Sequence, residues 1–222
     1  MELRAVLTGD IIDSSRLEEA KFQMVMEQLG NELARLKNAE RIDFYEMYRG
    51  DAFQTYLKNP GEGLNILFKI RTLINSLKPE TDKRGQQPAF NIRFGLGIGF
   101  LSGEPDNLQT KETPFVLSGQ ALDKISTEGS TIAIKTENEF INQELDTEFF
   151  LLEYILQKWT PVAAGILYNK LYGQTERQIA GELGISQSAV NQHSRQACWN
   201  GIQKLIERYQ SIINRLKNQV ND

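Results

Sequence analysis

The chain has 222 residues, 40% of them hydrophobic and 24% charged, which is an ordinary globular composition with room for one large or two small domains. No apolar run reaches membrane-spanning length, and the first ten residues contain neither a basic leader nor a small-residue cleavage site. We therefore expect a cytoplasmic protein with no membrane partner. One cysteine excludes an intrachain disulfide, and one histidine without a cysteine cluster argues against a His/Cys metal centre.

Charge is divided unevenly along the chain. The net charge is −4, but residues 151–222 hold eight Lys or Arg and five Asp or Glu, which gives them +3 and leaves −7 for residues 1–150. Only the C-terminal third therefore suits a polyanion such as nucleic acid. Because an excess of +3 is small, we expect two copies of the chain to be needed for useful DNA affinity.

The first 136 residues alternate between short strand patterns and longer helix patterns. Apolar runs predict strands at residues 3–8, 90–101 and 130–135, with a hairpin at 43–58. Apolar residues three and four apart predict helices from residue 15 or 16 to 37, from 60 to 77 and from 118 to 126. This order predicts an α+β fold that begins with a ferredoxin-like βαββαβ unit.

The strand at residues 90–101 carries glycines at positions 95, 97 and 99, all on one face. Something must approach the backbone closely there, and a packed helix is the default, with a ligand as the alternative. The GxGxG string is not a dinucleotide fingerprint, because it lies inside a strand and does not open a helix.

Two carboxylates are expected at neighbouring strand ends. Asp10 follows the first strand, and Asp51 lies in the turn of the hairpin at residues 43–58. Short connections favour adjacent strands, so the two side chains should lie within reach of one ion. Mg²⁺ binds to paired carboxylates beside backbone carbonyls, and water and substrate phosphates occupy its remaining coordination positions. The alternative is a pair of acids that cap loops.

The segment GDIID, followed by a helix and then YRGDAF, resembles the palm domain of class III nucleotidyl cyclases. That resemblance implies a nucleotide ligand and a Mg²⁺ site formed by Asp10, the carbonyl of Ile11 and Asp51. FGLGIG at residues 94–99 looks like the cyclase strand after the second helix, and SGQALDKIST at 118–127 is similar in position to the cyclase GxAVNxAxR helix.

Three positions depart from the cyclase pattern. Asp123 and Thr127 stand where the cyclase helix carries the Asn and Arg that stabilise the transferring phosphate, and Met47 stands where a base-contacting Lys is expected. Loss of a cation that offsets developing phosphoryl charge typically raises the barrier by several kcal/mol. We therefore assign no catalytic residue and do not expect cyclase activity.

Residues 137–159 predict a helical connector, and residues 160–222 predict an all-α domain. Within that domain, residues 175–195 predict a helix, a tight turn and a second helix. Thr175 and Ser186 are the N-caps, and Gly184 ends the first helix in a left-handed conformation. A helix-turn-helix of this kind places its second helix in the DNA major groove. The alternative is an ordinary helical hairpin with a glycine turn.

The second helix of this motif has an exposed polar face. Five side chains on this face have the length and chemistry to contact base edges or phosphates of double-stranded DNA: Gln187, Ser188, Asn191, Gln192 and Arg195.

The segment after the motif, residues 197–219, has no proline and predicts one long helix. Its apolar stripe is spaced three and four apart and includes Ile202, Leu205, Tyr209, Ile212 and Leu216. This is the seam of a two-stranded coiled coil, so it predicts a homodimer with its two recognition helices about 34 Å apart. The alternative is that the stripe folds back onto the connector helix of the same chain.

The palm followed by the ending GISQSAVNQHSRQACWNGI resembles the SatD-type transcriptional regulators of bacteria over nearly the whole chain. We divide the chain into a cyclase-like palm at residues 1–136, a connector at 137–159 and a DNA-binding domain with a dimerisation helix at 160–222. We expect a dimeric DNA-binding regulator whose palm senses a nucleotide or a metal ion. The alternative is an active metal-dependent nucleotidyl cyclase or polymerase-like enzyme with an accessory DNA-binding tail.

Overall fold

The computed structural model describes residues 1–48, 50–78, 90–103, 112–128 and 130–218. The strands are β1 (Glu2–Ile11), β2 (Phe44–Met47), β3 (Ala52–Leu57), β4 (Ile92–Leu101) and β5 (Ile132–Thr136). The helices are α1 (Glu19–Asn38), α2 (Gly63–Ser76), α3 (Thr113–Glu128), α4 (Glu139–Leu156), α5 (Pro161–Leu171), α6 (Glu176–Leu183), α7 (Gln187–Gln196) and α8 (Trp199–Asn218). Two 3-10 turns, η1 (Ser14–Arg16) and η2 (Pro60–Glu62), precede α1 and α2.

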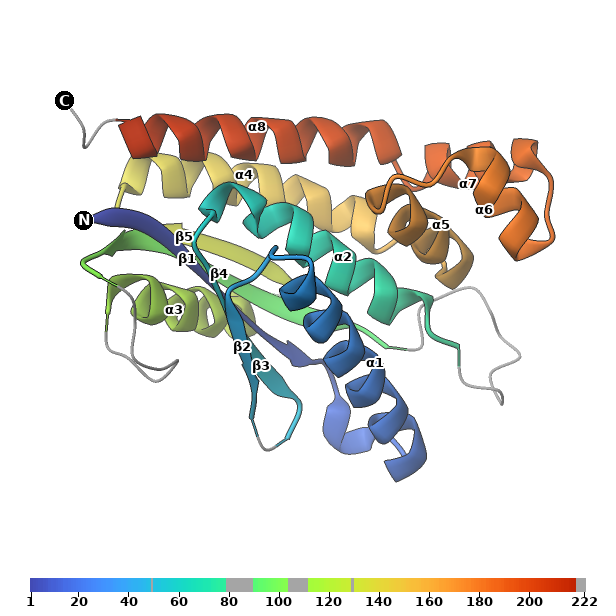
Figure 1. Ribbon diagram of the computed structural model, residues 1–222, viewed down its shortest axis with the longest axis horizontal. Helices are drawn as coiled ribbons and strands as arrows, with labels where there is room; N and C mark the ends of the chain where they lie inside the picture. Colours follow the sequence, from blue (N-terminus) through green and yellow to red (C-terminus); the bar gives the residue numbers. More distant parts are fainter. Residues whose placement is uncertain (49, 79–89, 104–111, 129, 219–222) are drawn as a thin grey trace.

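These five strands form one mixed sheet in the order β2-β3-β1-β4-β5 (Figure 1). β1 is antiparallel to both β3 and β4, whereas β5 is parallel to β4. From β1 to β4, two split βαβ units interleave, so the expected α+β class and βαββαβ unit are confirmed. The helix α3 then connects β4 to its parallel neighbour β5, and it begins at Thr113, five residues before the predicted start.

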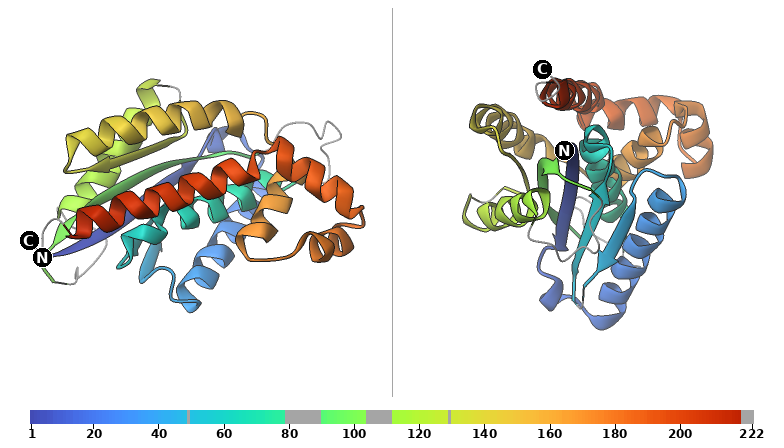
Figure 2. Two further views of the ribbon diagram at one scale, coloured as in Figure 1. Left: turned by 90° about the horizontal axis from the view of Figure 1, so that it is seen from above. Right: turned by 60° about the vertical axis from the view of Figure 1, so that its left-hand side comes forward.

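The two faces of the sheet are covered by different helices. In the right-hand view of Figure 2, α1 and α2 lie on one side of the sheet and α3 lies on the other. Alternation along β1 gives the reason: Leu7 points into the main core, and the next residue, Thr8, donates a hydrogen bond to Ser118 of α3.

The glycine face of β4 packs against α3, which confirms the expected close approach of a helix. A Cβ on Gly95 would lie 2.3 Å from the carbonyl oxygen of Ser118, and one on Gly97 would lie 2.2 Å from the carbonyl oxygen of Pro114. Both contacts are with helix backbone, so no side-chain rotation can relieve them. The glycines therefore set how close α3 lies to the sheet.

Replacing Gly97 with alanine should lower the free energy of unfolding by about 1–3 kcal/mol or more, because α3 must move away from β4 to admit the methyl group. Urea unfolding would measure the loss. Gly119→Ala, within α3, is the matched control, since a Cβ there meets nothing within 4 Å. Alanine in a helix interior should leave stability unchanged or raise it slightly. Equal losses in the two variants would contradict this account of the glycine face.

The C-terminal helices share a core with the sheet. The main cluster of buried side chains includes Phe94 of β4, Leu152 of α4, Leu167 of α5 and Ile212 of α8. Tyr209 of α8 is fully buried, and its hydroxyl donates a hydrogen bond of 2.6 Å to the carbonyl oxygen of Pro60. The helix α8 lies along the molecule beside α4 (Figures 1 and 2). The proposed domain boundaries at residues 136 and 159 stay predictions, and one continuous core crosses both.

The predicted dimer seam is not an exposed surface. Its residues Ile202, Tyr209, Ile212 and Leu216 are at most 8% exposed, and Leu205 is half-buried against the same core. We correct their role accordingly: they pack within one chain, largely near η2 and α2. The periodicity identified the apolar face of α8 but did not identify the surface that covers it.

No helix in the described part of the chain has the length and apolar character needed to cross a bilayer.

Candidate functional site

The predicted metal ligands meet at one end of the sheet. In the strand register, Asp10 lies opposite Ala52 of β3 on one side and Arg93 of β4 on the other. Asp51 directly precedes β3, and its carbonyl oxygen accepts a hydrogen bond of 3.2 Å from the amide of Ile11. The fold thus brings Asp10, Ile11 and Asp51 to one end of the sheet, as neighbouring strands should.

A residue that sequence analysis missed occupies the centre of this end. Arg93 forms a two-pronged ion pair with Asp10, with Nε 2.8 Å from Oδ1 and Nη2 2.7 Å from Oδ2. Asp51 accepts a hydrogen bond from the hydroxyl of Ser14. The pKa of Arg93 is raised, first by its hydrogen bonds with Asp10 and further by the charges of Asp10, Asp51 and Asp13. One guanidinium therefore pairs with Asp10 and offsets part of the negative charge of the two carboxylates that were predicted to hold a metal ion.

This arrangement does not fit a magnesium ion. Both carboxylate oxygens of Asp10 are hydrogen-bonded to Arg93, in the paired geometry that guanidinium and carboxylate favour. Mg²⁺ needs near-octahedral oxygen ligands at about 2.0–2.1 Å, so Asp10 would have to leave Arg93 first. Among the residues that the structure describes, no group of three or more His, Cys, Asp or Glu side chains is arranged to hold a metal.

A row of polar side chains continues from this ion pair along the side of the sheet that carries α3. The amide of Gln54 donates to the hydroxyl of Thr8 at 3.0 Å, and that hydroxyl donates to Ser118 at 3.0 Å. The hydroxyl of Tyr48 donates to the carbonyl oxygen of the Gln54 side chain at 3.1 Å. These hydroxyl and amide groups can exchange hydrogen bonds with a polar ligand beside the Arg93 cation.

The second candidate site is the α6–α7 pair. The hydroxyl of Thr175 accepts a hydrogen bond from the amide of Gln178 in a complete capping box, and Gly184 ends α6 with φ of 64°. Ser186 caps α7 by accepting a hydrogen bond of 3.1 Å from the amide of Ala189. The predicted caps and turn are therefore confirmed. Ile179 of α6 and Val190 of α7 are fully buried together with Ile166 of α5, which fixes the angle between the helices.

The outer face of α7 is polar and exposed. All the side chains that we predicted to contact DNA, Gln187, Ser188, Asn191, Gln192 and Arg195, are exposed. His193 is half-buried beside them. A shallow depression of about 460 Å³ runs over this face between Ser188 and Gln196. The geometry presents these groups outward, whereas their contact with DNA stays a prediction.

One acid lies beside this face and is compensated within the chain. Glu176, at the start of α6, lies 2.7 Å from the ammonium of Lys170 and accepts a weaker hydrogen bond of 3.4 Å from Asn191. The hydrogen bond from Lys170 is the main reason that the pKa of Glu176 is lowered. Lys170 was not predicted to contribute to this site, although it lies only six positions before Glu176 in the sequence.

The chain matches no protein-family model and no curated protein. Solved structures with a similar fold include a bacterial light-regulated adenylyl cyclase, with 11% identity, a TM-score of 0.44, and 60% of this chain and 75% of that chain covered. They also include the GGEEF domain of a diguanylate cyclase from Vibrio cholerae, with 15% identity, a TM-score of 0.44, and coverage of 62% and 84%. The guanylate cyclase domain of RhGC from Catenaria anguillulae has 17% identity, a TM-score of 0.40, and coverage of 60% and 78%.

Proposed function

We propose that the protein is a DNA-binding transcriptional regulator in which α7 contacts bases in the major groove of double-stranded DNA. The observation that carries this proposal is the outward display of amide, hydroxyl and guanidinium groups along α7, on a helix fixed by a capped turn and a buried anchor at Val190. Asn and Gln side chains pair with adenine, and Arg pairs with guanine or phosphate. The +3 charge of residues 151–222 favours the same surface.

The palm would act on the DNA-binding helices through α5. Glu32 of α1 is buried and accepts hydrogen bonds from Tyr168, at 2.7 Å, and from Tyr172. Burial is the main cause that raises the pKa of both tyrosines. Arg35 lies 3.7 Å from the ring centre of Tyr172. The helix α5 also packs on α6 and α7. A displacement of α1 would therefore be transmitted through the packed side chains of α5 to the exposed face of α7.

For the palm we propose a regulatory role in binding a phosphate-bearing ligand of the nucleotide class. The row of Thr8, Gln54 and Tyr48 offers hydroxyl and amide groups to such a ligand. Arg93 would bind a phosphate oxygen in exchange for Asp10. A nucleotide that binds only the folded chain raises its apparent melting temperature. A thermal-shift screen of nucleotides with and without divalent metal is the direct test, and no shift with any nucleotide would remove this role.

Replacing Gln187, Asn191 and Arg195 together by alanine should abolish sequence-specific DNA binding and leave weak nonspecific binding. Asn191→Ala alone should cost about 1–3 kcal/mol if the amide pairs with a base. The DNA would be the duplex enriched from a random pool by wild-type protein, and affinity would be measured by fluorescence anisotropy at fixed salt.

The matched control replaces Gln120, Asn214 and Arg215 by alanine. These are the same three residue types, also exposed, on α3 and near the C-terminal end of α8. The control should bind like wild type. If no sequence is enriched, or if the α7 triple variant binds the enriched duplex as tightly as the control does, α7 does not contact bases.

A further inference from the structure

The helix α4 has an apolar outer face that no other described element covers. Its residues Phe140, Phe150, Leu151 and Tyr154 are 75%, 62%, 61% and 59% exposed, and we call them the α4 stripe. In the part of the chain that the structure describes, the other exposed large hydrophobic side chains, Met1, Val116 and Leu183, are scattered over different elements. A concentration of this kind on one helix is typical of an interface.

The stripe is separate from the face that packs into the core. Leu145, Phe149, Leu152 and Leu156 point inward and are at most 5% exposed. Together with the partly buried Ile141 and Ile155, these residues account for six of the ten apolar residues of α4, and the four residues of the stripe are not covered by any described element. The rings of Phe150 and Tyr154 meet edge to face, with centroids 5.9 Å apart, so a partner would meet an already ordered surface.

Charge limits what can cover the stripe. The helix α4 contains five acidic residues and no Lys or Arg. A surface of anionic lipid attracts helices with basic polar faces, so α4 is unsuited to it. A strongly basic partner would need free carboxylates beside the stripe, and three of the five carboxylates, Glu144, Asp146 and Glu148, are already paired with cations of the chain.

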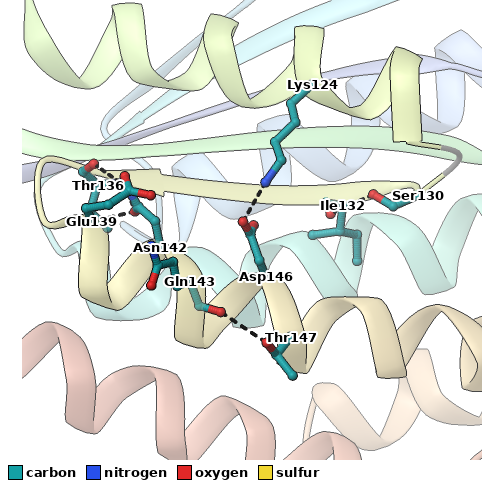
Figure 3. A network of polar contacts seen from close by, with 9 residues as sticks. All are labelled: Lys124, Ser130, Ile132, Thr136, Glu139, Asn142, Gln143, Asp146 and Thr147. Carbon is teal, nitrogen blue, oxygen red and sulfur yellow. Dashed lines mark hydrogen bonds and ion pairs between the residues drawn. The ribbon is translucent and has the colours of Figure 1, made fainter.

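Three of the acids that flank the stripe are paired with cations inside the chain. Arg208 of α8 forms ion pairs with Glu144 and, at 3.8 Å, with Glu148. On the other flank, Lys124 of α3 reaches across β5 to Asp146, as Figure 3 shows. These internal pairs reduce the repulsion that two acidic helices would otherwise exert on each other. The surroundings of the stripe therefore permit a second copy of the same helix.

We propose that the α4 stripe is the interface of a two-fold symmetric homodimer of this chain. In such a dimer the same patch serves on both subunits, so each apolar side chain meets another apolar side chain. Three aromatic residues and one leucine supply roughly 500 Å² per subunit, and a standard interface buries about 800 Å² per partner. The exposed neighbours Gln143 and Thr147 lie on the same face and contribute to the remainder. This interface would form whether or not the chain binds DNA.

The test is the oligomeric state of the whole chain, measured by light scattering after size exclusion and by sedimentation. Wild type should be a dimer at micromolar concentration. Phe150→Glu combined with Leu151→Glu should raise the dimer dissociation constant at least about 100-fold, because each glutamate would be buried at the interface without a partner. Both positions face solvent in the single chain, so the circular dichroism spectrum and the melting temperature of the monomer should be retained.

Leu183→Glu, on the exposed side of α6, is the matched control and should remain dimeric. As a second measurement, Leu151→Cys should give a covalent dimer with a bismaleimide cross-linker, whereas Leu183→Cys and wild type, which has Cys198 alone, should not. A wild-type chain that is monomeric at tens of micromolar would overturn the proposal, whatever else binds the stripe. So would a double glutamate variant that is as dimeric as wild type.

Discussion

Replacing Trp159 with alanine should lower the free energy of unfolding by about 3–5 kcal/mol, the range for removal of a buried aromatic ring. Trp159 lies between α4 and α5 and is fully buried, with its ring 6.3 Å from that of Phe68 in α2. Its indole N–H donates a hydrogen bond of 3.1 Å to the carbonyl oxygen of Ala197, just before α8. One side chain therefore joins the palm, the connector and the start of the last helix.

Two variants separate the parts of this effect. Trp159→Phe keeps most of the apolar volume and removes the hydrogen bond, so it should cost less than alanine does. Trp199→Ala, at the half-buried second tryptophan, should also cost clearly less than Trp159→Ala. Chemical denaturation followed by circular dichroism would measure all three. A loss below about 1 kcal/mol for Trp159→Ala would show that this junction does not contribute to the core.

The same experiment tests the division into domains. If one core joins the palm to the C-terminal helices, unfolding should be a single transition whose midpoint moves as a whole in Trp159→Ala. Two transitions, only one of which responds, would instead support folding units that are separate at residue 159. The sequence suggested that boundary because Thr160 and Pro161 open a new helix, and a helix start is a local signal. Local signals do not report whether the next helix packs back on the previous domain.

Local signals did predict the features that depend on neighbouring residues. The cap at Thr175, the turn at Gly184 and the cap at Ser186 follow from backbone chemistry within a few residues, and the structure has each of them. The glycine face of β4 was also predictable, because period-two alternation puts Gly95 and Gly97 on one side of the strand.

Features that depend on pairing across the fold were not predictable in the same way. The stripe of α8 has coiled-coil spacing, but burial of Tyr209 against η2 satisfies that spacing equally well. The pair of Arg93 with Asp10 depends on the register between β1 and β4, which no local pattern gives. A signal was present nonetheless: Arg93 is the one charged residue in the strand at residues 90–101, which is otherwise almost entirely apolar. Such a residue in a buried strand calls for an acidic partner.

Replacing Arg93 with alanine should raise the affinity of the sheet end for Mg²⁺ or Mn²⁺ above that of the wild-type chain. The substitution frees both carboxylate oxygens of Asp10 beside Asp51 and removes the cation that balances them. Two carboxylates without a compensating charge attract a divalent ion, which can complete its shell with water. The variant itself should be less stable by about 1 kcal/mol, since both partners of the ion pair keep contact with water.

Calorimetric titration with Mn²⁺ and a metal-dependent thermal shift would measure this gain. Arg93→Lys retains a positive charge beside Asp10 and should gain little affinity. Adding Asp10→Asn to Arg93→Ala should remove the new site, because one of its two carboxylates is lost.

The same proteins incubated with nucleoside triphosphates would test for turnover by chromatography. The single variant Asp10→Asn is included as a further control. If wild type binds Mn²⁺ as well as Arg93→Ala does, and if it forms a product that is lost in Asp10→Asn, then metal displaces Arg93 from Asp10. The nucleotidyl cyclase alternative would then replace the regulatory role of the palm.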